Sequence, residues 1–267
     1  MRKKLSLLCI AIFPIFIALS TVTAFATMTQ EKEKSDHDKN KRSIYVVGDS
    51  TASNYASSLA PRAGWGQVFG ELFDKKIAVK NHATSGRSSK SFIDEGRLTV
   101  VLNEIEKGDY LFIQFGHNDQ KDDDPSRYTE PYTTYKSYLK QYIDGAYVKG
   151  AIPVLVTSVE RRRFTDDGQA RDSLGDYPKA MKELGEELNV PVIDLTEKSK
   201  EMYEEIGPEG TKNVFLWIEA GEHENYPNGV QDNTHFQENG ARLIAQLVAE
   251  DIKKLQLKYL HSHLISK

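Results

Sequence analysis

Short apolar segments alternate with longer amphipathic segments along this chain, and that alternation is the strongest constraint on its fold. We predict strands at Ser43–Val47, Ile77–Lys80, Tyr110–Phe115, Ala151–Thr157 and Val190–Asp194. We predict helices at Trp65–Phe73, Arg97–Lys107, Thr133–Val148, Tyr177–Leu188 and Glu238–Leu257. Strands that alternate with helices form a parallel sheet with helices on both faces. The sequence therefore predicts one α/β domain over residues 43–267.

The first 42 residues have a different composition from the rest of the chain. A basic start, Arg2-Lys3-Lys4, precedes the apolar run Leu5–Ser20, and Ala24-Phe25-Ala26 has the small-x-small pattern of a processing site. These features are typical of a secretory signal peptide, which we predict at residues 1–26. Residues 27–42 are charged, which predicts a flexible linker. We therefore expect a secreted, extracellular protein.

Composition excludes several classes of partner and chemistry. The net charge is −4, and a mildly acidic chain has no electrostatic case for nucleic acid; after cleavage of the signal peptide we also expect no membrane association. The single cysteine, Cys9, lies in the predicted signal peptide. The mature protein would have no disulfides, no thiol catalysis and no cysteine-bound metal. The spacing of histidines and acids also predicts no metal site, and we expect no cofactor and a monomer.

Polar residues of unusual type follow the predicted strands. Ser50 follows the first strand, residues 84–88 (TSGRS) the second, residues 116–119 (GHND) the third and residues 157–163 (TSVERRR) the fourth. Residues 232–235 (DNTH) precede the predicted last helix. Ligands of open parallel sheets bind outside the carboxyl ends of the strands. We therefore expect these five segments to meet at one edge.

Three of these residues have the chemistry of a nucleophilic triad. Ser50 follows Gly48-Asp49 at a strand-to-helix turn, which would expose its hydroxyl group as the nucleophile. His235 is the candidate base, and Asp232, three residues earlier, can orient its imidazole within one loop or turn. Taken singly, a serine after Gly-Asp is also a common turn residue, and Asp-x-x-His is a common helix cap.

Three groups are candidates for an oxyanion hole. They are the backbone N–H of Ser50, the backbone N–H of Gly86 and the side-chain amide of Asn118. Gly86 lacks a side chain, so its backbone can approach a ligand closely. Such donors stabilise the negative charge that develops on a carbonyl oxygen during acyl transfer. Alternatively, both Gly86 and Asn118 could be ordinary turn residues.

The order of these blocks resembles the SGNH hydrolase superfamily. The matching segments are GDSTAS at 48–53, ATSGRSS at 83–89, GHND at 116–119 and DNTH at 232–235. The resemblance implies a flavodoxin-like three-layer α/β/α sandwich around a central parallel sheet. It also implies a triad of Ser50, His235 and Asp232, with Ser50, Gly86 and Asn118 as the oxyanion hole.

A narrower resemblance is to the rhamnogalacturonan acetylesterase family. It rests on GDST at 48–51, AGWGQVF at 63–69, NHATSGRSSKSF at 81–92, QFGHND at 114–119, SVERRRF at 158–164, DSLGDYP at 172–178 and NYPNGVQDNTHF at 225–236. This similarity implies a serine esterase that removes O-acetyl groups from the pectic polysaccharide of plant cell walls. An acetylated polysaccharide is therefore the expected partner.

Several other residues have side chains that suit an acidic sugar polymer. The aromatic rings of Trp65, Trp217 and Tyr226 could stack on sugar rings, and Arg87 and Arg161 could bind galacturonate carboxylates. We include Asp49, the neighbour of Ser50, among the candidate substrate-binding residues. These aromatic rings could equally fill the core, and the run Arg161–Arg163 could be a solvated loop. The sequence assigns no role to Asp119 or Glu160.

Two other functions remain open from the sequence. The same serine chemistry could act on another acyl chain, as in a secreted lipase or thioesterase, or on acetylated xylan. A non-catalytic polysaccharide-binding module on an esterase fold would predict a broken triad, whereas all four blocks are intact here.

Overall fold

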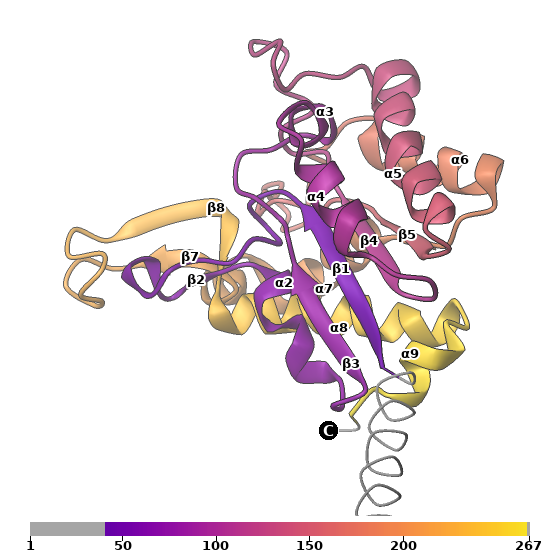
Figure 1. Ribbon diagram of the computed structural model, residues 1–267. Coiled ribbons are helices and arrows are strands. Elements are labelled where there is room, and N and C mark those ends of the chain that lie inside the picture. The colour runs from indigo at the N-terminus through magenta and orange to yellow at the C-terminus, as the bar shows by residue number, and fades with distance from the viewer. Residues whose placement is uncertain (1–40, 266–267) are drawn as a thin grey trace, which may run out of the picture. The chain divides into compact units, whose positions relative to one another are not determined.

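The computed structural model describes residues 41–265, and a parallel sheet lies at the centre of this region (Figure 1). Its strands are β1 (Arg42–Gly48), β3 (Ile77–Asn81), β4 (Tyr110–Gln114), β5 (Ile152–Val156) and β6 (Val192–Ile193). Their spatial order is β3-β1-β4-β5-β6, and every pairing is parallel. This is the flavodoxin-like order. The predicted fold class is confirmed, and each predicted strand is present.

Side chains that alternate along the central strands separate two apolar cores. Ile44 and Val46 of β1 belong to one core, whereas Tyr45 and Val47 belong to the other. The first core lies against α2 (Trp65–Val68) and α8 (Glu238–Lys254), and the second against α4 (Arg97–Glu104), α5 (Lys136–Val148) and α6 (Tyr177–Leu188). Strands buried on both faces read as continuous apolar runs, as β1 does. The result is the three-layer sandwich (Figure 1).

The helices agree with the sequence predictions in place but not always in length. Helix α6 has the predicted bounds, and α5 follows a single turn of π-helix, η3 (Pro131–Tyr135). The predicted helix at residues 65–73 divides into α2 and a 3₁₀ segment, η2 (Phe69–Leu72). Three helices were not predicted: α3 (Ser89–Asp94), α7 (Leu195–Gly210) and α9 (Lys258–Ser262). Because α9 follows α8, the predicted last helix is not the last one.

A second, antiparallel sheet was also not predicted. It has the order β2-β8-β7 and consists of β2 (Arg62–Ala63), β8 (Val230–Gln237) and β7 (Phe215–Ile218). Strand β8 is polar along much of its length and leads directly into α8. Its sequence therefore lacks the apolar alternation that marks a strand. The remaining short elements are the 3₁₀ turns η1 (Ser57–Leu59) and η4 (Thr211–Asn213).

The predicted signal peptide and almost all of the predicted linker lie outside the described residues. Strand β1 begins at Arg42, the last residue of that linker, and the described residues from Arg42 onward form one compact unit. None of the helices within residues 41–265 is long and apolar enough to cross a bilayer.

Candidate active site

The candidate site begins at the turn that follows β1. Ser50 lies two residues beyond the end of this strand, and 7% of its surface is exposed. The Asp49 carboxylate accepts hydrogen bonds from the backbone N–H and the hydroxyl of Thr51, at 2.9 and 2.8 Å. Tyr55 donates its phenol hydrogen to the Ser50 carbonyl at 2.7 Å. These contacts fix the backbone on both sides of Ser50. Tyr55 lies in no sequence motif and was missed.

The structure brings Ser50, His235 and Asp232 into one hydrogen-bonded chain. The Ser50 Oγ lies 2.8 Å from His235 Nε2, and His235 Nδ1 lies 2.7 Å from Asp232 Oδ2. Ser50 and His235 are 185 positions apart in the sequence. A base within this distance of a serine, itself oriented by a carboxylate, can remove the hydroxyl proton during attack on a carbonyl.

The Asp232 carboxylate is held in its ionised form. Burial would raise its pKa, but the hydrogen bond and charge of His235 and the backbone N–H groups of Thr234 and His235 lower this pKa to about 2. Those two N–H groups donate to Asp232 Oδ1 at 2.8 and 3.0 Å. An ionised carboxylate next to Nδ1 keeps the proton on that nitrogen, which leaves Nε2 free to accept the serine proton.

A β-bulge places the base and its carboxylate at the site. Along β7, the consecutive residues Phe215 and Leu216 pair with Phe236 and Asp232 of β8. The three residues between, Asn233–His235, are therefore extra and project from the ladder. Bulges near active sites commonly re-aim a side chain in this way. The Asp-x-x-His spacing predicted a loop or single turn here, whereas the structure has an irregular strand.

The bulge is itself anchored by two side chains from other elements. Asn233 Oδ1 accepts hydrogen bonds from Trp217 Nε1 at 3.0 Å and from Arg162 Nη1 at 3.3 Å. The Arg162 backbone N–H also donates to the Asn233 carbonyl at 2.9 Å, and its guanidinium lies 4.5 Å from the Trp217 ring centre. We call Arg162, Trp217 and Asn233 the bulge anchor. No sequence motif marked Asn233 as important beyond its place between Asp232 and His235.

Loss of the bulge anchor is expected to slow the reaction. In Asn233→Ala the Oδ1 acceptor is absent, so the bulge gains freedom and the imidazole leaves its attack geometry for part of the time. We expect kcat to fall about tenfold to a hundredfold with little change in KM, because such losses follow from displacements of about 1 Å. Steady-state kinetics on 4-nitrophenyl acetate measures this. Trp217→Phe, which removes one donor and keeps an aromatic ring, is expected to have a smaller effect; unchanged kcat in both variants would contradict the role.

The candidate oxyanion donors come from the loops after β3 and β4. Gly86 has a φ angle of +81°, which a residue with a side chain rarely adopts, and no atom lies within 4 Å of the place where a Cβ would be. Asn118 is 5% exposed, and its Nδ2 donates to the Arg87 carbonyl at 3.1 Å. An amide nitrogen carries two hydrogens, so one remains for an oxyanion.

Asp119, to which the sequence assigned no role, supports the loop that carries Asn118. It is fully buried and accepts hydrogen bonds from the backbone N–H of Ser89 at 3.1 Å, from the Ser89 hydroxyl and from the Thr129 hydroxyl at 3.0 Å. Burial raises the pKa of Asp119 to about 7 in spite of these donors. The hydrogen bonds between Asp119 and Ser89 hold the loop of Asn118 against the start of α3.

Two predicted substrate-binding residues are wrong. Trp65 has 0% exposed surface, and its indole N–H donates to Gln114 Oε1 at 2.5 Å within the core, so its ring cannot stack on a sugar. Asp49 is also 0% exposed, and its Oδ2 lies 3.2 Å from His117 Nδ1. Burial would raise the pKa of Asp49, but His117 and Thr51 hold it below its ordinary value. Asp49 therefore supports the turn of Ser50 from inside.

The other predicted substrate-binding residues lie partly at the surface. The Arg87 guanidinium is bonded to Glu95 at 3.0 and 3.1 Å, and Arg161 Nη1 donates to the Ser173 carbonyl at 3.0 Å. Tyr226 donates its hydroxyl to the Leu59 carbonyl at 3.0 Å. Contact of these three residues with substrate stays a prediction. Trp217 is not a free platform, because the cations of Arg162 and Lys212 both lie over its ring.

Glu160 also has a structural environment that the sequence did not reveal. Its side chain is 1% exposed, and its Oε1 accepts hydrogen bonds from the backbone N–H of Arg161 at 2.8 Å and from the hydroxyl of Ser173. These hydrogen bonds hold the loop that follows β5 in place.

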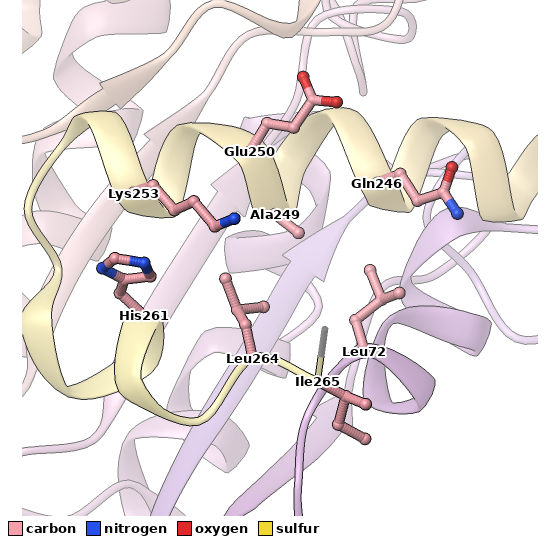
Figure 2. A pocket seen from close by; sticks show the side chains of 8 residues that line it. All are labelled: Leu72, Gln246, Ala249, Glu250, Lys253, His261, Leu264 and Ile265. Atoms are coloured by element: carbon pink, nitrogen blue, oxygen red, sulfur yellow. The ribbon is translucent and has the colours of Figure 1, made fainter. Parts of the chain in front are cut away.

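A pocket of about 360 Å³ lies between η2, the second half of α8 and α9, away from the predicted site residues (Figure 2). Its lining mixes Leu72, Ala249, Leu264 and Ile265 with the polar side chains of Gln246, Glu250, Lys253 and His261. None of the triad residues lines it. Within residues 41–265, no three His, Cys, Asp or Glu side chains form a cluster that could hold a metal ion.

Comparison with known proteins agrees with this geometry. The family model described as GDSL-like lipase/acylhydrolase matches residues 44–248, which include all of the triad. The chain belongs to this family. It is accordingly a carboxylic ester hydrolase, and the resemblance inferred from the sequence motifs is confirmed.

Two relatives of this GDSL-family enzyme come from Bacillus subtilis strain 168. The chain is 52% identical to the rhamnogalacturonan acetylesterase RhgT over 84% of its own length and 94% of the relative. It is 47% identical to the probable rhamnogalacturonan acetylesterase YesY, over 80% and 94% of the two chains. Among solved structures, the YxiM protein of Bacillus subtilis superimposes with a TM-score of 0.70 at 29% identity. That match covers 82% of this chain and 58% of YxiM.

Proposed function

We propose that this GDSL-family enzyme is a secreted serine esterase that removes O-acetyl groups from rhamnogalacturonan. The observation that carries the proposal is the continuous chain from Ser50 Oγ through the His235 ring to the Asp232 carboxylate, with separations of 2.8 and 2.7 Å. The identity of 52% to a rhamnogalacturonan acetylesterase, over nearly all of that relative, supports the choice of substrate. The signal-like N-terminal sequence supports secretion.

The proposed reaction passes through an acetyl-enzyme. Ser50 Oγ attacks the carbonyl carbon of the acetyl group while His235 Nε2 takes the hydroxyl proton. The N–H groups of Ser50 and Gly86 and the amide of Asn118 stabilise the tetrahedral oxyanion. The intermediate collapses, and His235 gives its proton to the departing sugar oxygen. Water, activated by the same imidazole, then hydrolyses the Ser50 ester and releases acetate.

Acetate release from a panel of acetylated polysaccharides tests the choice of polymer. We expect the fastest release from acetylated rhamnogalacturonan, with slower release from acetylated homogalacturonan and acetylated xylan. Faster release from acetylated xylan than from acetylated rhamnogalacturonan would make xylan the substrate instead. The assignment of the triad would not change.

A chain-length series of 4-nitrophenyl esters tests the preference for acetyl groups. The loops at residues 84–88 (TSGRS) and 116–119 (GHND) contain no aliphatic side chain that could line a groove for a long acyl chain. Each methylene buried in such a groove would contribute about 0.8 kcal/mol, and these two loops offer no apolar surface for it. We therefore expect kcat/KM to be higher for the acetate than for the octanoate. The reverse order would favour a lipase or thioesterase.

A further inference from the structure

Two exposed arginines lie side by side on a short hairpin next to the candidate active site. Phe164 and Ala170 form an antiparallel bridge, and the Arg171 backbone N–H donates to the Arg163 carbonyl at 2.8 Å. Arg163 and Arg171 are therefore directly opposite each other. Side chains alternate across a β-ladder, so these two project from the face opposite Phe164, which packs on the core. We call Arg163 and Arg171 the arginine pair.

No carboxylate in the described part of the chain neutralises the arginine pair. No carboxylate oxygen of residues 41–265 lies within 4.0 Å of either guanidinium, and both residues are exposed. Of the acids in and beside the hairpin, Asp172 pairs with Lys200, Asp167 is bonded to Thr165, and Asp166 is exposed near its tip. Like charges directly opposite each other on paired strands are destabilising, and an anion bound by both would remove that repulsion.

A row of contacts joins the arginine pair to the loop of Asn118. Arg161, two residues before Arg163 and separated from it by a bend at Arg162, contacts Ser173, which likewise follows Arg171 by two residues. With the Gln120 amide oriented so that its nitrogen meets an acceptor, its oxygen accepts hydrogen bonds from Arg161 Nη1 and Nη2 at 2.7 and 2.6 Å. Gln120 is two residues from Asn118. Burial and then the nearby charge of Arg163 lower the pKa of Arg161.

The hairpin also begins at the catalytic bulge. The Arg162 backbone N–H donates to the carbonyl of Asn233, which stands between Asp232 and His235. Arg163, the first member of the arginine pair, is therefore the residue directly after Arg162, which contacts the segment that carries the base. A polymer with an acetyl group at Ser50 would extend over this region with its neighbouring sugars.

We infer that the arginine pair is a carboxylate-binding subsite, which recognises a uronic acid residue of the polysaccharide beside the sugar that carries the acetyl group. Two guanidinium groups present planar donor pairs that match carboxylates, and arginine keeps its charge at any working pH. The inference rests on the proposed function, because it assigns the subsite to the same substrate. It adds that the enzyme selects the acidic backbone and not only the ester.

Competition by an unacetylated ligand tests the subsite separately from the proposed function. Oligogalacturonate is used to inhibit hydrolysis of 4-nitrophenyl acetate by the wild-type enzyme and by the double variant Arg163→Gln/Arg171→Gln. We expect the inhibition constant to rise about tenfold in the double variant, while kcat/KM for the neutral ester stays unchanged. Raising the ionic strength is expected to weaken inhibition of the wild type more than that of the variant.

Matched controls separate a specific subsite from overall charge. Lys75→Gln/Lys149→Gln removes two exposed cations that precede β3 and β5, at the end of the sheet opposite Ser50, and should leave the inhibition constant unchanged. Methyl-esterified oligogalacturonate should inhibit the wild type and the arginine variant to a similar extent. Equal inhibition of wild type and arginine variant by the free acid, or absence of inhibition of the wild type, would overturn the subsite. Failure of the wild type to deacetylate any polysaccharide would instead contradict the proposed function.

Discussion

Ser50→Ala is expected to lower acetate release by at least about 10⁴-fold while leaving the protein folded. Without the hydroxyl there is no acetyl-enzyme, and the base has no nucleophile to activate. Removal of the serine from a comparable triad costs about 10⁶ in kcat, with a remainder due to the oxyanion hole and binding. The Oγ of Ser50 makes its side-chain hydrogen bond to His235 alone among the described residues, so its loss removes little structure.

The measurement for Ser50→Ala is kcat/KM on 4-nitrophenyl acetate and on acetylated rhamnogalacturonan. Thermal unfolding by circular dichroism verifies that the variant is folded. Ser58→Ala is the matched control, because Ser58 is an exposed serine of η1 outside the triad, and its Ala variant should keep full activity. His235→Ala should match Ser50→Ala, and the double variant should be no worse, since the two residues act as a unit. Retention of most activity by folded Ser50→Ala would refute the assignment.

Asp232→Asn is expected to lower kcat by about 10⁴-fold, the size of the effect in serine proteases with an equivalent triad. The carboxylate accepts the Nδ1 hydrogen of His235, which leaves Nε2 as the acceptor for the serine proton. An asparagine amide can donate to Nδ1 instead, which moves the ring hydrogen to Nε2 and blocks proton transfer. KM should change little because Asp232 does not contact the acetyl group. A loss of less than tenfold would show that this carboxylate does not orient the base.

The same variant should change how stability depends on pH. The pKa of Asp232 is about 2 in the folded protein, below its ordinary value of 3.8. As the pH falls, the unfolded chain binds this proton first, so the stabilisation is present above about pH 4 and is lost toward about pH 2. Asparagine does not titrate. The difference in melting temperature between wild type and Asp232→Asn should therefore be largest above about pH 5 and shrink on acidification; a constant difference would contradict the pKa.

The sequence predicted the central sheet because buried parallel strands leave a strong signal. Residues such as Ile44–Val47 form unbroken apolar runs, and the polar residues after each run lie at the common carboxyl edge. Strand β8 left no such signal. Its residues are mostly polar and form a bulge, so Asp232 and His235 could be named as a pair while the structure that holds them could not be predicted.

The two wrong substrate-binding residues have a common cause. Trp65 and Asp49 are of residue types that suit a sugar site, but the residue type does not specify whether a side chain points into the site or into the core. Trp65 turns inward because its indole N–H finds Gln114 in the core, and Asp49 because Thr51 and His117 satisfy its carboxylate. The bulge anchor was missed for the converse reason, since the contact of Asn233 with Arg162 joins residues 71 positions apart.

The most direct measurement is the position of a covalent label left by an organophosphate ester. Such reagents react with a serine only where a base activates it and an oxyanion hole receives the phosphoryl oxygen. Digestion and mass spectrometry should place one label on Ser50 of the wild-type enzyme, in proportion to lost activity, and none on His235→Ala. Loss of activity with Ser50 unmodified, or a label on a different residue, would contradict the central claim that Ser50 is the nucleophile.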